Sequence, residues 1–202
     1  MSEVKAIIFD MGGVILNAKI ESAYEILSKN LGIEKTTFDA VRNKYIKDAQ
    51  KGEISTDDFL DKICSELNLE KSNLKKLWEQ AYSEVMVLDQ KVLDLAKSLK
   101  ATGYKIALIT NTIEIHSNIN KSRGIYNEFN PAILSTEAHM LKPNKEIYQL
   151  MLERLNLQPS ECIFIDDREE HILPATELGI PSILFKNLSQ LKDSLKEKDI
   201  KF

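Results

Sequence analysis

Three acidic residues in this sequence are placed where they could do chemistry on phosphorus. Asp10 ends one apolar run, and the pair Asp166-Asp167 ends another. A carboxylate can act as a nucleophile and form a covalent acyl phosphate. Three carboxylates that meet at one point raise one another's pKa unless a cation neutralises them, and oxygen ligands in this number suit Mg²⁺. These residues therefore predict a carboxylate nucleophile beside a divalent metal.

Polar residues elsewhere in the chain could bind the oxygens of a phosphoryl group. Thr110 offers a hydroxyl, Asn111 an amide and Lys142 an ammonium, which together complement a phosphoryl group's charge. Thr110 and Asn111 could instead satisfy backbone groups at the start of a helix. Gly12 and Gly13 allow a sharp turn after the first carboxylate, where backbone N–H groups could approach an anion.

The elements that must position these residues are short, buried strands. Branched apolar runs predict parallel strands at 4–9, 105–109, 161–165 and 182–185, with a weaker one at 132–134. Helical spacing fills the intervals: one helix ends before Gly103, another has Pro143 in its first turn, and a third ends at Gly179. This alternation predicts an α/β fold with a doubly wound parallel sheet, whose active site lies outside the carboxyl ends of the strands.

The segment from about residue 19 to residue 84 contains no convincing strand. Its apolar residues have helical spacing, Ser55 and Asp58 resemble a capping pair, and Ser72 could cap a further helix. We therefore expect a small all-helical cap at 17–85, inserted after the first strand, and a catalytic core formed by 1–16 and 86–202.

Composition excludes several other classes of protein. The 27 basic and 31 acidic side chains give a net charge of −4, and neither sign forms a long block, which argues against a nucleic-acid partner. No apolar run approaches membrane-spanning length. Cys64 and Cys162 match neither a zinc nor a disulfide spacing, so a reduced, cytoplasmic setting is the simplest interpretation.

The sequence resembles the haloacid dehalogenase superfamily, because it carries four motifs of that family in order: FDMGGV, LITN, LKP and FIDD. The resemblance implies a Rossmann-like core and, in the family's first subgroup, a helical cap over the phosphate site. It implies Asp10 as nucleophile, with Mg²⁺ as cofactor. By the same resemblance the metal ligands are Asp10, the backbone carbonyl of Gly12 and Asp166, and Asp167 is either a further ligand or a residue that contacts the ligands. The phosphate would be held by Thr110, Asn111 and Lys142. The turn after Asp10 adds Gly12 and Gly13 to the expected substrate-binding residues.

The first motif departs from the family at one position. The family usually has a second aspartate two residues after the nucleophile, where it serves as general acid and base, and this chain has Gly12. Loss of such a group typically costs about 10²–10⁴ in rate. His116 is one candidate replacement. The sequence is similar to a branch that includes bacterial sugar-phosphate phosphatases, such as glucose-1-phosphate phosphatase, which also lack this aspartate. A second departure is His171, where the family often has Asp or Asn.

The function expected from these residues is a Mg²⁺-dependent phosphatase that acts on a small phosphate ester, possible substrates being sugar phosphates, through an aspartyl phosphate. Asp10, Lys142 and His116 are its expected catalytic residues. Gly12 leaves open a non-catalytic or weakly active binding module. A third alternative is displacement of halide by a carboxylate without a metal, against which the pair Asp166-Asp167 argues.

Overall fold

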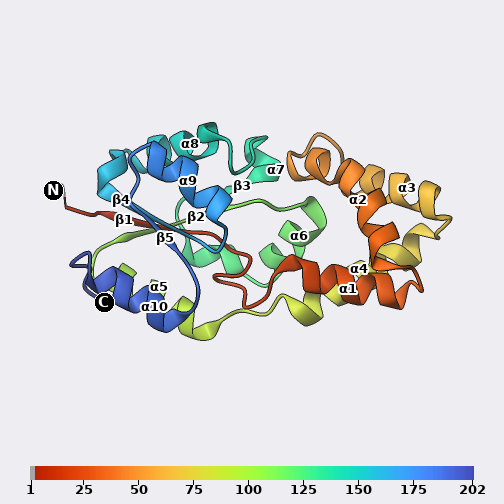
Figure 1. Cartoon of the computed structure of the whole chain (residues 1–202), viewed down its shortest axis with the longest axis horizontal. Helices are drawn as coiled ribbons and strands as arrows, with labels where there is room; N and C mark the ends of the chain where they lie inside the picture. The colour runs from red at the N-terminus through yellow and green to blue at the C-terminus, as the bar shows by residue number, and fades with distance from the viewer. Residues whose placement is uncertain (1–2) are drawn as a thin grey trace.

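The computed structural model describes residues 3–202, which form a single five-stranded parallel sheet with helices on both faces (Figure 1). The order of strands across the sheet is β3-β2-β1-β4-β5. Their bounds are β1 (Ala6–Phe9), β2 (Lys105–Thr110), β3 (Ala132–Leu134), β4 (Cys162–Asp166) and β5 (Ser182–Leu184). All four pairings are parallel, which confirms the predicted doubly wound α/β fold.

The central strand β1 explains why the first apolar run is continuous. Ile7 pairs with Ile106 of β2 on one side and with Ile163 of β4 on the other. All four residues of β1 are inaccessible to solvent, as expected for a strand that is covered on both faces. Asp10 is the first residue after β1, so the strand carries it to the carboxyl edge of the sheet.

Two layers of helices cover the sheet (Figure 1). On one face lie α5 (Gln90–Ala101) and α10 (Leu188–Lys196), and on the other α8 (Lys145–Leu155) and α9 (Glu169–Glu177). The prediction that Pro143 lies in the first turn of a helix is wrong, because α8 begins at Lys145 behind the N-cap residue Asn144. The remaining helical elements of the core are α6 (Glu114–Ser122), η1 (Ile125–Glu128), α7 (Ser135–Ala138) and η2 (Pro159–Glu161).

Four helices follow β1 and lie together at one end of the molecule (Figure 1). They are α1 (Ile20–Asn30), α2 (Lys35–Gln50), α3 (Thr56–Leu67) and α4 (Lys71–Val85). Their core surrounds Trp78, whose ring centroid lies 5.6 Å from that of Tyr24, 5.8 Å from Phe38 and 5.5 Å from Phe59. The same cluster contains Ile113 and Ile115, so these helices share their core with the start of α6. The division into a cap at 17–85 and a core stays a prediction.

Of the two helix caps predicted in this region, one is confirmed and the other is wrong. Ser55 and Asp58 form the predicted capping box at the start of α3. Ser72 does not cap α4, because the carboxylate of Glu70 accepts hydrogen bonds from the N–H groups of Ser72 and Asn73 at 2.8 and 2.6 Å. None of the helices in residues 3–202 has the length and apolar character needed to cross a membrane.

Candidate active site

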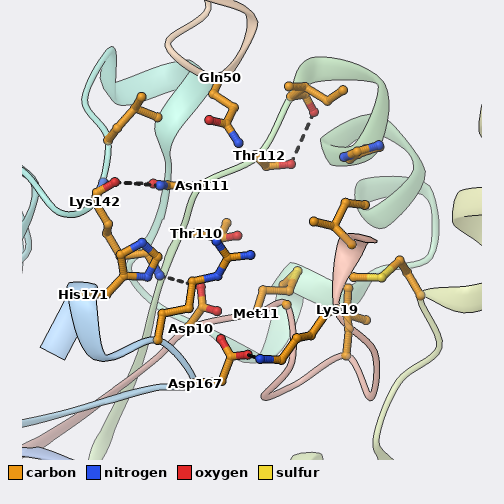
Figure 2. A pocket seen from close by; sticks show the side chains of 18 of the residues that line it. Asp10, Met11, Lys19, Gln50, Thr110, Asn111, Thr112, Lys142, Asp167 and His171 are labelled. Carbon is orange, nitrogen blue, oxygen red and sulfur yellow. Dashed lines mark hydrogen bonds and ion pairs between the residues drawn. The ribbon is translucent and has the colours of Figure 1, made fainter. Parts of the chain in front are cut away.

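Residues from four separate parts of the chain meet at the carboxyl edge of the sheet. Asp10 follows β1, Thr110 ends β2, Asp166 ends β4, and Lys142 lies in the loop before α8. Asp10, Thr110 and Lys142 line a cavity of about 570 Å³ between the sheet edge and the inserted helices (Figure 2). The strand order thus brings together the residues that the sequence singled out.

A buried ammonium links two of the carboxylates. The Nζ atom of Lys142 lies 2.5 Å from Oδ1 of Asp10 and 2.6 Å from Oδ2 of Asp166. The side chains of Lys142 and Asp166 are fully inaccessible to solvent. A charge buried this deeply is tolerated only when it is paired and hydrogen-bonded, and each of these groups meets that condition.

The two carboxylates respond to this environment in opposite directions. Burial raises the pKa of Asp10 to about 6, although the nearby ammonium of Lys142 opposes the shift. Burial acts the same way on Asp166, but Lys142 and His171 outweigh it and lower the pKa of Asp166 to about 2. For Lys142, attraction to both carboxylates exceeds the effect of burial and raises its pKa. At neutral pH the site therefore holds charged groups in close contact.

Asp167 completes a group of carboxylates that fits a divalent cation. One oxygen each from Asp10, Asp166 and Asp167 lies within 4.8 Å of the other two. The Oδ2 atom of Asp167 is buried and accepts no hydrogen bond from the described residues; the Nζ atom of Lys19 is 3.3 Å away, which makes an ion pair only. A buried carboxylate oxygen without a donor is suited to a metal, and hard oxygen ligands favour Mg²⁺.

The two glycines after Asp10 have different roles. Gly13 has a φ of +79°, and a Cβ atom there would lie 2.5 Å from Oδ2 of Asp167, so only glycine fits. Its N–H donates to the carbonyl oxygens of Leu16 and Ala18 at 2.9 and 3.1 Å, so the predicted contact of this N–H with an anion does not hold. Gly12 lines the cavity, and a Cβ atom there would meet only Met86, at 3.9 Å.

The amide of Asn111 is not free to bind phosphate as predicted. Its Nδ2 donates to the carbonyl of Lys142 at 2.8 Å, and its Oδ1 accepts from the N–H of Lys142 at 2.9 Å (Figure 2). Asn111 therefore fixes the backbone that carries the buried lysine. The hydroxyl of Thr110 lines the cavity, and within residues 3–202 it has no hydrogen-bond partner, so it stays available to a ligand.

Comparison with known proteins decides the family. Residues 4–179 match the model of the haloacid dehalogenase-like hydrolases. The chain belongs to this family. It is 28% identical over 205 residues to D-ribitol-5-phosphate phosphatase from Bacteroides thetaiotaomicron, covering 95% of this chain and 97% of that protein. It is 26% identical over 204 residues to bifunctional epoxide hydrolase 2 from Sus scrofa, covering 91% of this chain but spanning only 37% of that longer protein.

A solved structure of another haloacid dehalogenase family enzyme extends the comparison. That enzyme, also from Bacteroides thetaiotaomicron, was solved with magnesium and inorganic phosphate. It superposes with a TM-score of 0.75 at 27% sequence identity, covering 93% of this chain and 98% of that one. The fold of this hydrolase is therefore one in which magnesium and phosphate have been observed in a related protein.

His116 is poorly suited in this hydrolase to the proton-carrying role expected of it. It lines the cavity, but only 5% of its surface is exposed. Its Nε2 accepts a hydrogen bond from the indole N–H of Trp78 at 2.8 Å, and its ring stacks on Tyr82 with centroids 4.0 Å apart. Burial, assisted by Arg42, lowers the pKa of His116 to about 3. A neutral histidine with its basic nitrogen occupied is a packing residue, and the expected catalytic role is not supported.

His171 is the site residue to which the sequence assigned no function. Its Nδ1 lies 3.0 Å from both carboxylate oxygens of Asp166, and it lines the cavity (Figure 2). The hydroxyl of Tyr148 donates to its backbone carbonyl at 2.8 Å. The signal in the sequence was its position, because it stands where this family often has Asp or Asn. His171 orients the carboxylate of Asp166.

Proposed function

We propose that this protein is a Mg²⁺-dependent phosphatase that hydrolyses a small phosphate ester, with Asp10 as nucleophile. The observation that carries the proposal is the convergence of three carboxylates and one buried ammonium at the carboxyl edge of the sheet, beside one cavity. One oxygen from each of Asp10, Asp166 and Asp167 lies within 4.8 Å of the others, and Lys142 lies between two of them. The similarity to D-ribitol-5-phosphate phosphatase supports the same reaction class.

The residues divide the work as follows. An Oδ atom of Asp10 attacks phosphorus, the bond to the ester oxygen breaks, and the phosphoryl group is left on the carboxylate. Lys142 neutralises Asp10 in the free protein and can turn to the phosphoryl oxygens as charge moves there. Thr110 offers its hydroxyl to the same oxygens. Bound Mg²⁺, held by Asp10, Asp166, Asp167 and the carbonyl of Gly12, would neutralise negative charge on the carboxylates and the phosphate.

The site offers no side chain suited to the proton transfers that this chemistry requires. The ester oxygen needs a proton as it leaves, and the water that hydrolyses the aspartyl phosphate must lose one. Gly12 has no side chain to supply either, and His116 has its Nε2 bound to Trp78. We therefore expect a slow enzyme, most active on esters whose leaving oxygen is already acidic.

A phosphate-release assay tests the proposal. The purified protein is incubated with sugar phosphates, nucleotides and p-nitrophenyl phosphate, with Mg²⁺ or with EDTA. The proposal predicts release that requires Mg²⁺ and falls to background in Asp10→Asn. No release from any ester would favour a binding module. Undiminished turnover of Asp10→Asn, or activity that survives EDTA, would contradict the mechanism.

A further inference from the structure

The end of α2 that borders the cavity carries polar side chains that the proposed chemistry does not use. Lys47, Gln50 and Lys51 all line the cavity that contains Asp10. Gln50 and Lys51 follow Lys47 by three and four residues, so the helix turns both toward the same side as Lys47. Figure 2 shows the side chain of Gln50 directed into the cavity, toward Thr112. This helix end therefore lies where the part of a substrate beyond its phosphate would be.

Two of the cationic side chains that line the cavity have no carboxylate partner within it. Its carboxylates each have a cation nearby: Asp10 has Lys142, Asp167 has Lys19 at 3.3 Å, and Glu170 has Arg168 at 3.7 Å. The remaining cations of the lining are Lys47 and Lys51.

Neither of the remaining lysines is neutralised inside the cavity. The ammonium of Lys47 makes no ion pair or hydrogen bond with any residue in the range 3–202. The Nζ atom of Lys51 lies 3.6 Å from Glu53, a largely exposed side chain that is not part of the lining. The helix end thus presents two positive charges to a bound molecule.

A simple phosphate monoester does not account for these charges. Its negative charge lies at the reacting end, beside Asp10 and Lys142, so it offers no partner to the two lysines of α2. The cavity of about 570 Å³ is within the range of about 300–1,000 Å³ that is typical of pockets for whole small molecules. There is room beyond the phosphate for a further group.

We propose that the substrate carries a second anionic group, remote from the phosphate that is removed, and that Lys47 and Lys51 bind it. Gln50 lies between the lysines in the sequence and can hydrogen-bond to a hydroxyl in the connecting part of the molecule. The second group is a carboxylate or another phosphate, which share the negative charge that two ammonium groups recognise. This inference rests on the proposed phosphatase function and names its substrate class.

Matched pairs of esters test the inference. The carboxylate pair is 3-phosphoglycerate against glycerol 3-phosphate, and the phosphate pair is fructose 1,6-bisphosphate against fructose 1-phosphate. In at least one pair we expect kcat/KM to be about tenfold higher for the doubly anionic ester, because two partly exposed ion pairs are worth about that factor. The difference should lie mainly in KM and shrink at high ionic strength.

Variants of α2 assign the effect to these lysines. In Lys47→Gln/Lys51→Gln the ratio of kcat/KM for the doubly anionic ester to kcat/KM for its singly anionic partner should fall to near one. Lys44→Gln is the matched control, because Lys44 is on the same helix but pairs with Glu66 and does not line the cavity. It should keep the wild-type ratio. A ratio near one in the wild type for both pairs, or a preference that survives the double substitution, would overturn the inference.

A binding measurement separates failure of the inference from failure of the proposed function. Titration calorimetry of the same esters against Asp10→Asn, with Mg²⁺ present, reports affinity without turnover. Tighter binding of a doubly anionic ester would uphold the inference even if no ester were hydrolysed. Equal binding within both pairs would refute it, even if phosphate release were fast.

Discussion

The Nζ atom of Lys142 lies 2.5 Å from Oδ1 of Asp10, in a position that water does not reach. Removing the ammonium leaves the buried carboxylates of Asp10 and Asp166 facing each other without a cation. Loss of one partner from a buried ionic group typically costs about 3–5 kcal/mol. We expect Lys142→Met to lower the free energy of unfolding by that order in urea titrations with EDTA.

The matched control for this variant is Lys145→Met. Lys145 forms an exposed ion pair with Glu177, at 2.8 Å, and such pairs contribute at most about 1 kcal/mol. Mg²⁺ should restore part of the stability of Lys142→Met, because a cation bound only by the native state stabilises it. Equal urea midpoints for the two variants would show that the buried lysine is not needed to neutralise these carboxylates.

Gly12 offers a direct way to test the missing proton carrier. Its φ is not positive, and a Cβ atom would meet only Met86, at 3.9 Å, so an aspartate can be accommodated. A general acid and base contributes about 10²–10⁴ in rate. We expect Gly12→Asp to raise kcat/KM, which reports the step that expels the leaving group, by at least about tenfold on a sugar phosphate, and by less on p-nitrophenyl phosphate, whose leaving oxygen needs little protonation.

Two control variants accompany this substitution. Gly12→Ala adds a Cβ atom without a carboxylate and should keep the wild-type rate. Gly13→Ala would push a Cβ atom to 2.5 Å from Asp167 at a positive φ, and should lose activity. If Gly12→Asp folds normally and is no faster than Gly12→Ala, proton transfer is not what limits this protein.

Substitution of His171 should weaken Mg²⁺ binding more than it lowers the stability of the fold. Its Nδ1 is 3.0 Å from both oxygens of Asp166, and a group that orients a metal ligand is typically worth about 10–100-fold in metal affinity. We expect His171→Leu to weaken Mg²⁺ binding by that factor in calorimetry. His171→Asn can place an amide N–H near the same carboxylate and should retain most of the affinity. Equal affinities for the two variants would assign His171 to packing alone.

The buried ring of His116 makes stability depend on pH. Burial holds its pKa at about 3 in the native state, against 6.5 when exposed. Between these values the unfolded chain binds a proton at His116 that the folded chain does not. The contribution of His116 to the free energy of unfolding is therefore complete above pH 6.5 and is lost as pH falls. The loss is about 1.4 kcal/mol per pH unit over this range.

Urea titrations from pH 8 to pH 4 measure this dependence. His116→Gln keeps an acceptor for the indole of Trp78 but cannot titrate, so its free energy of unfolding should fall less steeply with acid than that of the wild type. Parallel pH profiles would mean that other groups cause the acid sensitivity.

The sequence predicted those features of the fold and site that depend on local pattern. The five strands lie within a residue or two of their predicted bounds, because buried parallel strands are continuous apolar runs. The convergence of Asp10, Asp166 and Lys142 followed from strand order alone. Helix starts were less predictable: Glu70 displaced Ser72 as a cap, since either side chain can accept from free N–H groups.

The roles of the two histidines could not be read from the sequence. His116 and His171 have the same chemistry, but Trp78 binds the ring of one and Asp166 contacts the ring of the other. Likewise, both ends of the Asn111 amide are used by the backbone of Lys142, a pairing across 31 residues. Such contacts depend on tertiary packing, which a single sequence does not display.

The measurement that bears most directly on Asp10 is covalent trapping of the aspartyl phosphate. The protein turns over p-nitrophenyl phosphate with Mg²⁺, is quenched with borohydride, and is digested for mass spectrometry. Reduction of an acyl phosphate converts that aspartate to homoserine. Because Gly12 supplies no base for the second step, the intermediate should accumulate, and we predict homoserine at position 10 only when substrate is present. Unmodified Asp10 in protein that is releasing phosphate would contradict the account.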